Sequence, residues 1–272
     1  MRKKRNSAKL LAILVMATAL AACGDLASSV TGEVQQSVMG DGSGSGKLVS
    51  VEKRSYEQSE IEELEVSAQA MEIRIERSTG EQAEVELLVD DNLHDRFVFE
   101  AKVDSGLLKV KIEEKSKSAF KDQTGARKLR ISLPDKMYRM LKVNNAFGSV
   151  EASNVETEAA EIRIDAGNIQ LKAVSGKLDL EANAGEIVVE GIALNNDLKA
   201  RTDVGRIAIH LNESPQDAGF KLKSEVGDVK VDLDEVEYSK QAANKKVGTI
   251  GTPNVQIEAY AAVGEIVVDT QR

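Results

Sequence analysis

Short stretches of alternating apolar and polar residues follow one another along most of the chain after residue 46. In the second half, a glycine and one polar residue precede many of them, as in Gly167-Asn-Ile-Gln-Leu and Gly185-Glu-Ile-Val-Val. A period of two places apolar side chains on one face of a strand and polar side chains on the other. The pattern therefore predicts strands with one buried face.

The glycine-led stretch is a repeat, with intervals near 18–22 residues and half-steps near 9–10. Glycine adopts a positive φ without steric cost, so we expect corners at these glycines. Asn196 replaces glycine in one copy, and the copy at Gly219 is weaker. A single copy is too short to bury its apolar face, so copies must stack. The seven expected corners are Gly148, Gly167, Gly176, Gly185, Gly205, Gly227 and Gly264.

These features predict an all-β fold, a β-solenoid built as a stack of short strands with Gly or Asn corners. A β-sandwich stays open, because its strands recur at 8–12 residues as well. Residues 47–145 alternate without the glycine period, so we expect them to form an irregular β-rich cap on the repeats at 146–272. Residues 236–246 are polar and predict an exposed loop or short turn.

The N-terminus has the organisation of an export signal. Five basic residues precede an uncharged run, residues 10–22, of roughly 20 Å if helical, which is short for a membrane-spanning helix. Leu20-Ala21-Ala22-Cys23 resembles the lipobox of bacterial lipoproteins. That resemblance implies cleavage between Ala22 and Cys23 and a diacylglyceryl group on the Cys23 thiol. A plain secretory signal with an incidental cysteine is the alternative.

Residues 23–46 predict a flexible tether between the lipid and the β-solenoid domain at 47–272. The segment ends in a Gly/Ser-rich run, and such chains reach roughly 25–30 Å on average at this length. The expected organisation is therefore a signal peptide at 1–22, a tether and one domain. It places the domain outside the cytoplasm, held at the cell membrane by its lipid.

Composition narrows the class of partner. The chain carries a formal charge of −9, and loss of the five basic leader residues makes it −14. This acidity disfavours a generic nucleic-acid binder. Residues 109–142 depart from it with 11 basic and 4 acidic residues. We interpret them as a solvated strand face, with anionic lipid headgroups or wall polymers as the alternative partner.

A family resemblance rests on three consecutive stretches, Leu129-Arg-Ile-Ser-Leu-Pro134, Tyr138-Arg-Met-Leu-Lys-Val143 and Gly148-Ser-Val. Together with Gly248-Thr-Ile-Gly251 and the closing copy at Gly264, they resemble the bacterial surface proteins called putative adhesins, or toastrack domains. The resemblance covers residues 48–272. It implies a single-chain β-solenoid at the cell envelope, with links to surface adhesion and envelope-stress signalling and with no catalytic residues.

Candidate chemistry is sparse. His94 falls in a charged loop, and alternation turns His210 away from Ile207 and Ile209, so neither predicts a catalytic site. Adjacent residues of a strand point to opposite faces, which makes acidic doublets poor catalytic pairs. Two acidic clusters, at 90–92 and 232–235, could hold Ca²⁺ weakly. No phosphate-binding glycine loop precedes a helix, and we expect no metal and no cofactor. The doublets are Glu62-Glu63, Asp90-Asp91, Glu113-Glu114 and Asp234-Glu235.

These observations favour a non-enzymatic binding, adhesion or scaffold surface over an enzyme. The alternative is a polysaccharide lyase or hydrolase on a β-helix, which would need a groove with catalytic acids and bases. A sensor that binds a membrane signalling protein is a further hypothesis.

Overall fold

The computed structural model describes residues 47–115 and 125–270, and this part of the chain is almost entirely β-structure. The predicted signal peptide, Cys23 and the tether lie outside the described residues. The strands of the N-terminal part are β1 (Leu48–Glu57), β2 (Glu63–Arg77), β3 (Gln82–Asp90), β4 (Phe97–Asp104), β5 (Leu107–Glu114) and β6 (Arg127–Leu133). Two short 3-10 helices, η1 (Gln58–Glu60) and η2 (Asp91–Arg96), lie between them.

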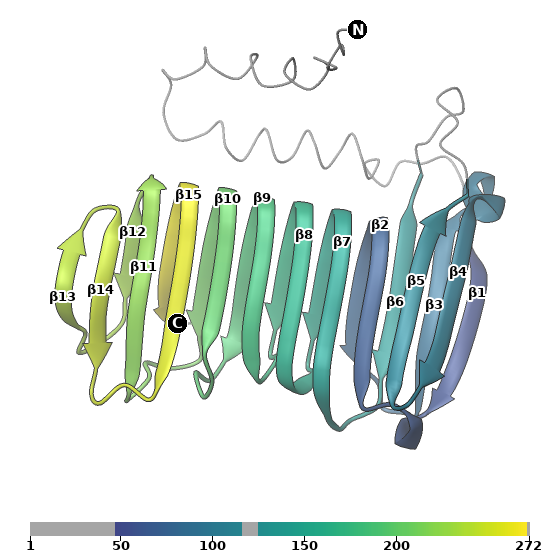
Figure 1. The fold of residues 1–272 in the computed structure, drawn as a ribbon, viewed down its shortest axis with the longest axis horizontal. Helices are drawn as coiled ribbons and strands as arrows, with labels where there is room; N and C mark the ends of the chain where they lie inside the picture. Colours follow the sequence, from purple (N-terminus) through teal and green to yellow (C-terminus); the bar gives the residue numbers. More distant parts are fainter. Residues whose placement is uncertain (1–46, 116–124, 271–272) are drawn as a thin grey trace, which may run out of the picture.

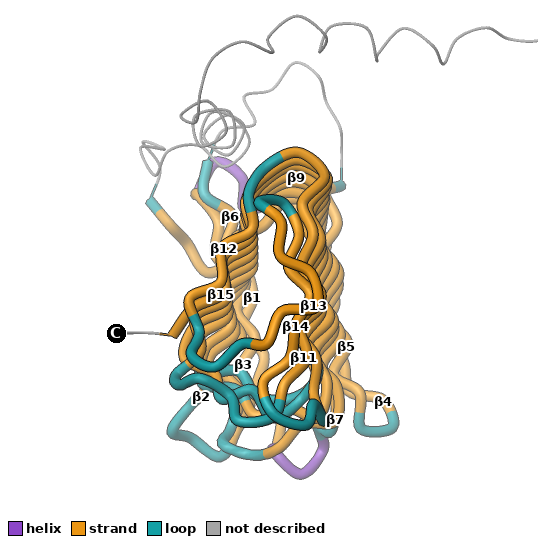
Figure 2. Tube along the Cα trace, turned by 90° about the vertical axis from the view of Figure 1, so that its left-hand side faces the viewer, coloured by secondary structure: helices purple, strands orange, loops and turns teal. Residues whose placement is uncertain are grey.

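The repeat region begins with long strands that each form most of one coil. They are β7 (Met137–Ser153), β8 (Glu156–Lys172), β9 (Lys177–Ile192) and β10 (Leu198–Leu211). Each bends back on itself near its middle, so the stack has two layers that are joined along one rim (Figures 1 and 2). We call the half before the bend the leading arm and the half after it the trailing arm. This arrangement confirms the predicted β-solenoid.

The bends coincide with a column of glycines. Gly148 pairs with Gly167, and Gly205 pairs with both Gly185 and Gly264. A Cβ atom placed on Gly185 would lie 1.8 Å from the carbonyl oxygen of Gly167 in the preceding coil. Glycine is therefore required at the bend by the close approach of the next backbone as well as by its φ of +141°.

All seven glycines singled out in the sequence have a positive φ, but they do not share one location. Gly176 lies in the connection between β8 and β9, where a Cβ atom would lie 2.1 Å from the Thr157 carbonyl oxygen. Asn154 and Ala173 also adopt a positive φ between coils. The half-steps of 9–10 residues thus reflect two kinds of turn in each coil, one at the bend and one between coils.

The core lies between the two layers. Alternation turns Ile162 and Ile164 of the leading arm of β8 inward, and Ile169 and Leu171 of its trailing arm face them from the other layer. Each is at most 2% exposed. Equivalent positions of the other coils continue the column, so each coil completes the burial of its neighbours.

The N-terminal part is more regular than expected. β2 forms a full coil that pairs with β7 along both arms. Its outer edge is covered in two pieces, because β5 pairs with the leading arm and β6 with the trailing arm. β4 then pairs with β5, β3 with β6, and β1 with β3, which closes this end of the stack. Residues 47–145, predicted from the sequence as an irregular cap, thus contain one regular coil, β2, and the strands that cover its outer edge.

The C-terminal end departs from the order of the sequence. After β10 the chain forms β11 (Ala218–Val226), β12 (Val229–Asp232), β13 (Glu237–Ala242), β14 (Lys245–Ile250) and β15 (Val255–Thr270). The last strand, β15, pairs with β10 on one side and with β11 and β12 on the other. The final coil therefore lies inside the stack (Figure 1).

Three local expectations are corrected. Residues 236–246 are not a loop, since they contain β13, the turn after it and the first residues of its antiparallel partner β14. The two strands form a hairpin that covers the end of the stack, where β14 pairs with β11. Asn196 lies in the connection before β10 without a positive φ, so it does not substitute for a corner glycine. Gly219 starts an ordinary stretch of β11 that pairs with β14 and β15.

Candidate functional site

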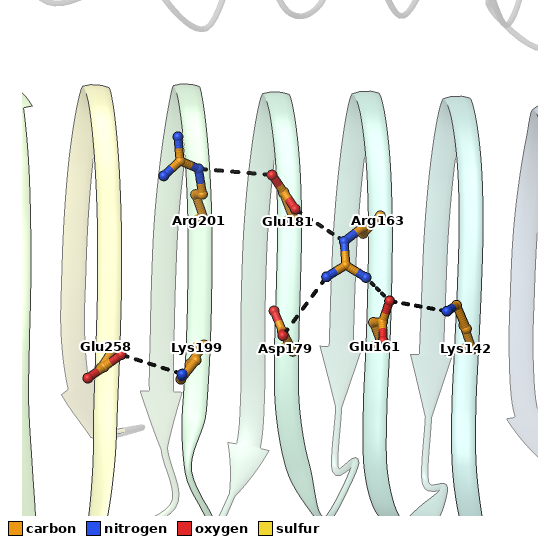
Figure 3. A network of polar contacts seen from close by, with 8 residues as sticks. All are labelled: Lys142, Glu161, Arg163, Asp179, Glu181, Lys199, Arg201 and Glu258. Atoms are coloured by element: carbon orange, nitrogen blue, oxygen red, sulfur yellow. Dashed lines mark hydrogen bonds and ion pairs between the residues drawn. The ribbon is translucent and has the colours of Figure 1, made fainter.

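The outer surface of the leading arms is a flat face covered by rows of charged side chains. Because the coils pair in register, Lys142, Glu161, Asp179 and Lys199 lie side by side on β7, β8, β9 and β10. Their row continues to Glu258 on β15 and ends at Lys221 on β11. Figure 3 shows that the charged side chains face one another across neighbouring coils.

Arg163 on β8 is the centre of this network. Its guanidinium group contacts Glu161 on its own strand, and it lies 3.2 Å from Glu181 and 4.0 Å from Asp179 on β9. Glu161 also lies 3.4 Å from Lys142 (Figure 3). The side chains in these pairs are 29–51% exposed, so each pair is hydrated and contributes little by itself.

A second cluster lies at the C-terminal end of the same face. The Tyr260 ring lies between Arg201 and Lys223, whose charged groups are 4.9 and 5.7 Å from its centroid. A hydrogen bond with Glu225 raises the pKa of Tyr260, and a hydrogen bond with Lys223 lowers the pKa of Glu225. Two cations and one carboxylate thus contact the same ring.

The basic stretch at 109–142 does not form a free cationic face in the described part of the chain. Most of its described side chains pair with acids, mainly on neighbouring strands, as in Lys109 with Glu65 at 3.1 Å and Arg130 with Glu86 at 3.4 Å. Arg139 contacts both Glu62 and Glu63 at 2.9 Å. This doublet converges on one cation, contrary to the expectation that its members point apart.

The two histidines lie far apart in the fold. His94, on η2, is exposed and lies 3.1 Å from its neighbour Asp95. His210, on β10, is half-buried and lies 2.5 Å from Asp269 on β15. Inter-coil pairing accounts for the second contact, since His210 and Asp269 occupy matched positions in neighbouring coils.

The remaining acidic candidates are dispersed as well. Asp90 is buried next to exposed Asp91, and Glu113 pairs with Lys111 whereas Glu114 pairs with Arg96. Asp234 and Glu235 are exposed in a turn. Within residues 47–115 and 125–270, no group of three or more acidic, histidine or cysteine side chains is arranged to hold a metal ion.

The hollows of the surface are shallow and open. One of about 450 Å³ lies beside the β13–β14 hairpin and is lined by residues that include Lys221, Glu237, Ser239 and Gln256. Another of about 300 Å³ crosses the trailing arms of β2, β7, β8 and β9. The surface therefore offers extended faces to a ligand.

In the portion that the structure describes, no helix has the length and apolar character needed to cross a bilayer.

The Arg163 network gives a quantitative prediction. Replacing Arg163 with glutamine should lower the free energy of unfolding by about 1 kcal/mol or less, and 1 M NaCl should shrink the difference. Urea unfolding at low and high salt measures both. Arg74→Gln is the matched control, because Arg74 pairs with only one carboxylate, Glu151, at 2.7 Å. An Arg163 effect that is independent of salt would show that packing of the side chain, not charge, stabilises this face.

The fold defines a class, a two-layered β-solenoid whose coils bend at a glycine column. Comparison with family models gives the particular family: residues 131–269 match Toastrack DUF4097. The match spans half of the chain, and the protein therefore belongs to this family. The resemblance that the sequence motifs indicated is confirmed.

Solved structures of similar fold come from several bacteria. A putative cell adhesion protein from Clostridium sporogenes has a TM-score of 0.50 and 14% identity, with 83% of this chain and 100% of that chain covered. A putative adhesin from Bacteroides fragilis has a TM-score of 0.40 and 15% identity, with coverages of 82% and 97%. No curated protein matches the chain. At these identities the similarity concerns the fold.

Proposed function

We propose that the protein is a lipid-anchored envelope protein that acts outside the cytoplasm as a non-enzymatic binding, adhesion or scaffold surface. The observation that carries the proposal is the flat outer face that the leading arms of the coils form. Their charged side chains recur in register from β2 to β11 and are held by partners on neighbouring coils. A regular face of this kind suits a large partner that makes many weak contacts.

The described acidic side chains support binding over hydrolysis. A glycosidase needs two carboxyl groups across one scissile bond, about 5–10 Å apart. Here many carboxylates of the outer surface are engaged by cations, as in Glu258 between Lys199 at 3.8 Å and Lys221 at 3.1 Å.

The proposed partners are a membrane, through a lipid on Cys23, and either a membrane signalling protein or an anionic wall polymer. The names of the adhesin-like relatives agree with a surface role. Cross-linking on intact cells, with and without envelope stress, followed by mass spectrometry tests for the protein partner. Recovery of no membrane protein under either condition would contradict the signalling form of the proposal.

The lipid anchor is tested by Cys23→Ala. The variant lacks the thiol that would carry the diacylglyceryl group, so we expect it to leave the membrane fraction or to remain an uncleaved precursor. Fractionation with immunoblotting, combined with labelling by a radioactive or clickable fatty acid, measures both outcomes. Ser28→Ala, five residues further on, is the control and should behave as the wild type does. Wild-type partitioning of Cys23→Ala would disprove the lipoprotein assignment.

A further inference from the structure

The rim where the coils bend carries an exposed row of apolar side chains. The residue before each bend glycine is apolar in all six coils of the glycine column, and pairing in register places these residues next to one another. The four larger ones, Phe147, Val204, Val226 and Val263, are 42–59% exposed. In the order of the stack, this apolar ridge consists of Phe147, Ala166, Ala184, Val204, Val263 and Val226.

Folding alone does not account for the ridge. Other outward positions of the same coils carry mainly charged or polar residues, as in the row from Lys142 to Lys221. The ridge side chains point away from the core, and their mutual contacts leave about half of each larger side chain in water. An exposed apolar row that recurs in every coil is the kind of surface that a partner covers.

Carboxylates border the ridge on both sides. The residue immediately before the ridge residue is acidic in three coils: Asp165, Asp203 and Glu225. The residue immediately after the bend glycine is also acidic in three coils: Glu186, Asp228 and Glu265. Arg206 is the single basic residue in these two rows. Four of the six carboxylates form ion pairs with cations of the same surface: Asp203 with Arg201 at 3.1 Å, Glu225 with Lys223 at 3.0 Å, Glu186 with Arg206 at 2.9 Å and Glu265 with Lys230 at 2.6 Å. The hydrogen bond with Lys230 holds the pKa of Glu265 below its usual range. Six carboxylates against these four cations leave the ridge apolar along its centre and net acidic along its flanks.

The spacing of the ridge matches one kind of partner. Neighbouring coils are about 4.8 Å apart, so the six ridge residues extend about 24 Å. One turn of an α-helix rises about 5.4 Å, so a helix of about 18 residues is about 27 Å long and lays one apolar stripe along the whole ridge. Basic residues beside that apolar stripe would face the carboxylates.

We propose that the ridge is a docking surface for a basic amphipathic helix of another protein. The acidic flanks disfavour the two other occupants of an apolar row. A second copy would bring carboxylates against carboxylates, and an anionic bilayer would repel them. The inference rests on the proposed binding function, but not on the lipid anchor.

Titration with designed peptides tests the proposal. The protein is the chain from residue 23 onward with Cys23→Ser, which keeps every described strand and carries no lipid. The probes are two fluorescein-labelled helical peptides of about 18 residues with one leucine stripe, flanked by Lys and Arg in the first and by Glu in the second. Fluorescence anisotropy should show at least about tenfold tighter binding of the basic peptide, and added salt should weaken it.

A substitution on the ridge should remove this difference. Val204→Asp places a charge at the centre of the ridge and should weaken binding of the basic peptide by about tenfold or more. Val98→Asp is the matched control, because Val98 is also exposed but lies on β4, away from the ridge. It should change binding less than about twofold. Circular dichroism melts of both variants confirm that they are folded.

Several results would overturn the proposal. Equal binding of the acidic peptide, or unchanged binding by Val204→Asp, would show that the ridge does not recognise a basic helix. Flotation with phosphatidylcholine vesicles that is lost in Val204→Asp would assign the ridge to a lipid surface. Sedimentation of a wild-type dimer that this variant abolishes would assign it to a second copy. Failure of this proposal is distinguishable from failure of the lipid-anchor proposal, because Cys23→Ala tests the anchor without any peptide.

Discussion

Gly185→Ala is expected to destabilise the protein by about 4 kcal/mol or more, a large effect for the addition of one methyl group. Its Cβ atom would lie 1.8 Å from the Gly167 carbonyl oxygen and 2.7 Å from the carbonyl carbon. The atoms in the way are backbone, so relief requires two paired coils to separate. The φ of +141° adds a strain of about 1–3 kcal/mol for a residue with a side chain.

Thermal and urea unfolding of Gly185→Ala measure this effect, and Gly191→Ala is the control. Gly191 also has a positive φ, +68°, but a Cβ atom there meets nothing closer than 3.6 Å. We expect it to cost about 1–2 kcal/mol, the ordinary penalty of a left-handed residue. Similar losses of stability in the two variants would mean that the close approach of the coils at the glycine column adds no cost beyond that of the positive φ.

The sequence predicts the central coils well because their intervals are regular. Gly148, Gly167, Gly185 and Gly205 follow one another at 18–20 residues, and the structure places them in one column. A positive φ at Gly185, the one property expected from sequence, would by itself cost a residue with a side chain about 1–3 kcal/mol. This cost omits the neighbouring carbonyl oxygen, because close approach between coils depends on the stack and not on the local sequence.

The coil of β2 shows why the glycine period alone misses part of the fold. Met71 occupies the position that pairs with Gly148, so β2 bends without a glycine. Its other neighbours, β5 and β6, pair with residues 63–67 and 72–77 and leave the bend itself free. A Cβ atom is therefore tolerated there. This coil is identifiable from sequence only by its alternation, which does not distinguish a coil from a cap.

The ridge was also open to prediction, since Phe, Ala or Val precedes every bend glycine in the sequence. Alternation is counted within a strand, and a residue at the bend belongs to neither arm. Its outward direction becomes evident only when the glycines are known to be bends. The charged rows could likewise be read only once the register was known. Arg163 and Glu181 are 18 residues apart in the sequence, and they meet because the strands pair in that register.

The position of β15 could not be derived from spacing. Gly227 follows Gly205 by 22 residues, an interval that suits direct neighbours, whereas Gly264 follows by 59. Charge does not show which coil neighbours the Gly205 coil either. Arg206 pairs with Glu265 at 3.4 Å in the structure, but Asp228 would offer it a carboxylate at the equivalent position of the other coil. In the structure, a Cβ atom on Gly264 would meet the Gly205 oxygen, and one on Gly227 would meet the Gly264 oxygen. These contacts define the order 205, 264, 227.

Removal of residues 255–272 is expected to unfold the C-terminal part of the stack. The deletion takes away the strand that joins β10 to β11 and β12, and with it the buried side chains of Ile257, Ile266 and Val268. Each contributes about 1.5–3 kcal/mol by burial, in addition to the lost ladder of hydrogen bonds. Hydrogen exchange should show strong loss of protection in β10, β11 and β14, with β7 and β8 retaining most of theirs.

Cross-linking determines whether β15 lies between β10 and β11 in the intact chain. Residues 201, 260 and 223 occupy matched positions on β10, β15 and β11, and strands that pair are about 4.8 Å apart. In a Cys23→Ser background, cysteine pairs at 201/260 and 260/223 should form disulfides, which need Cα atoms within about 7 Å. A pair at 201/223 spans two strand spacings and should stay reduced. Efficient oxidation of 201/223 would show that β11 pairs directly with β10, and the expected unfolding on truncation would lose its physical basis.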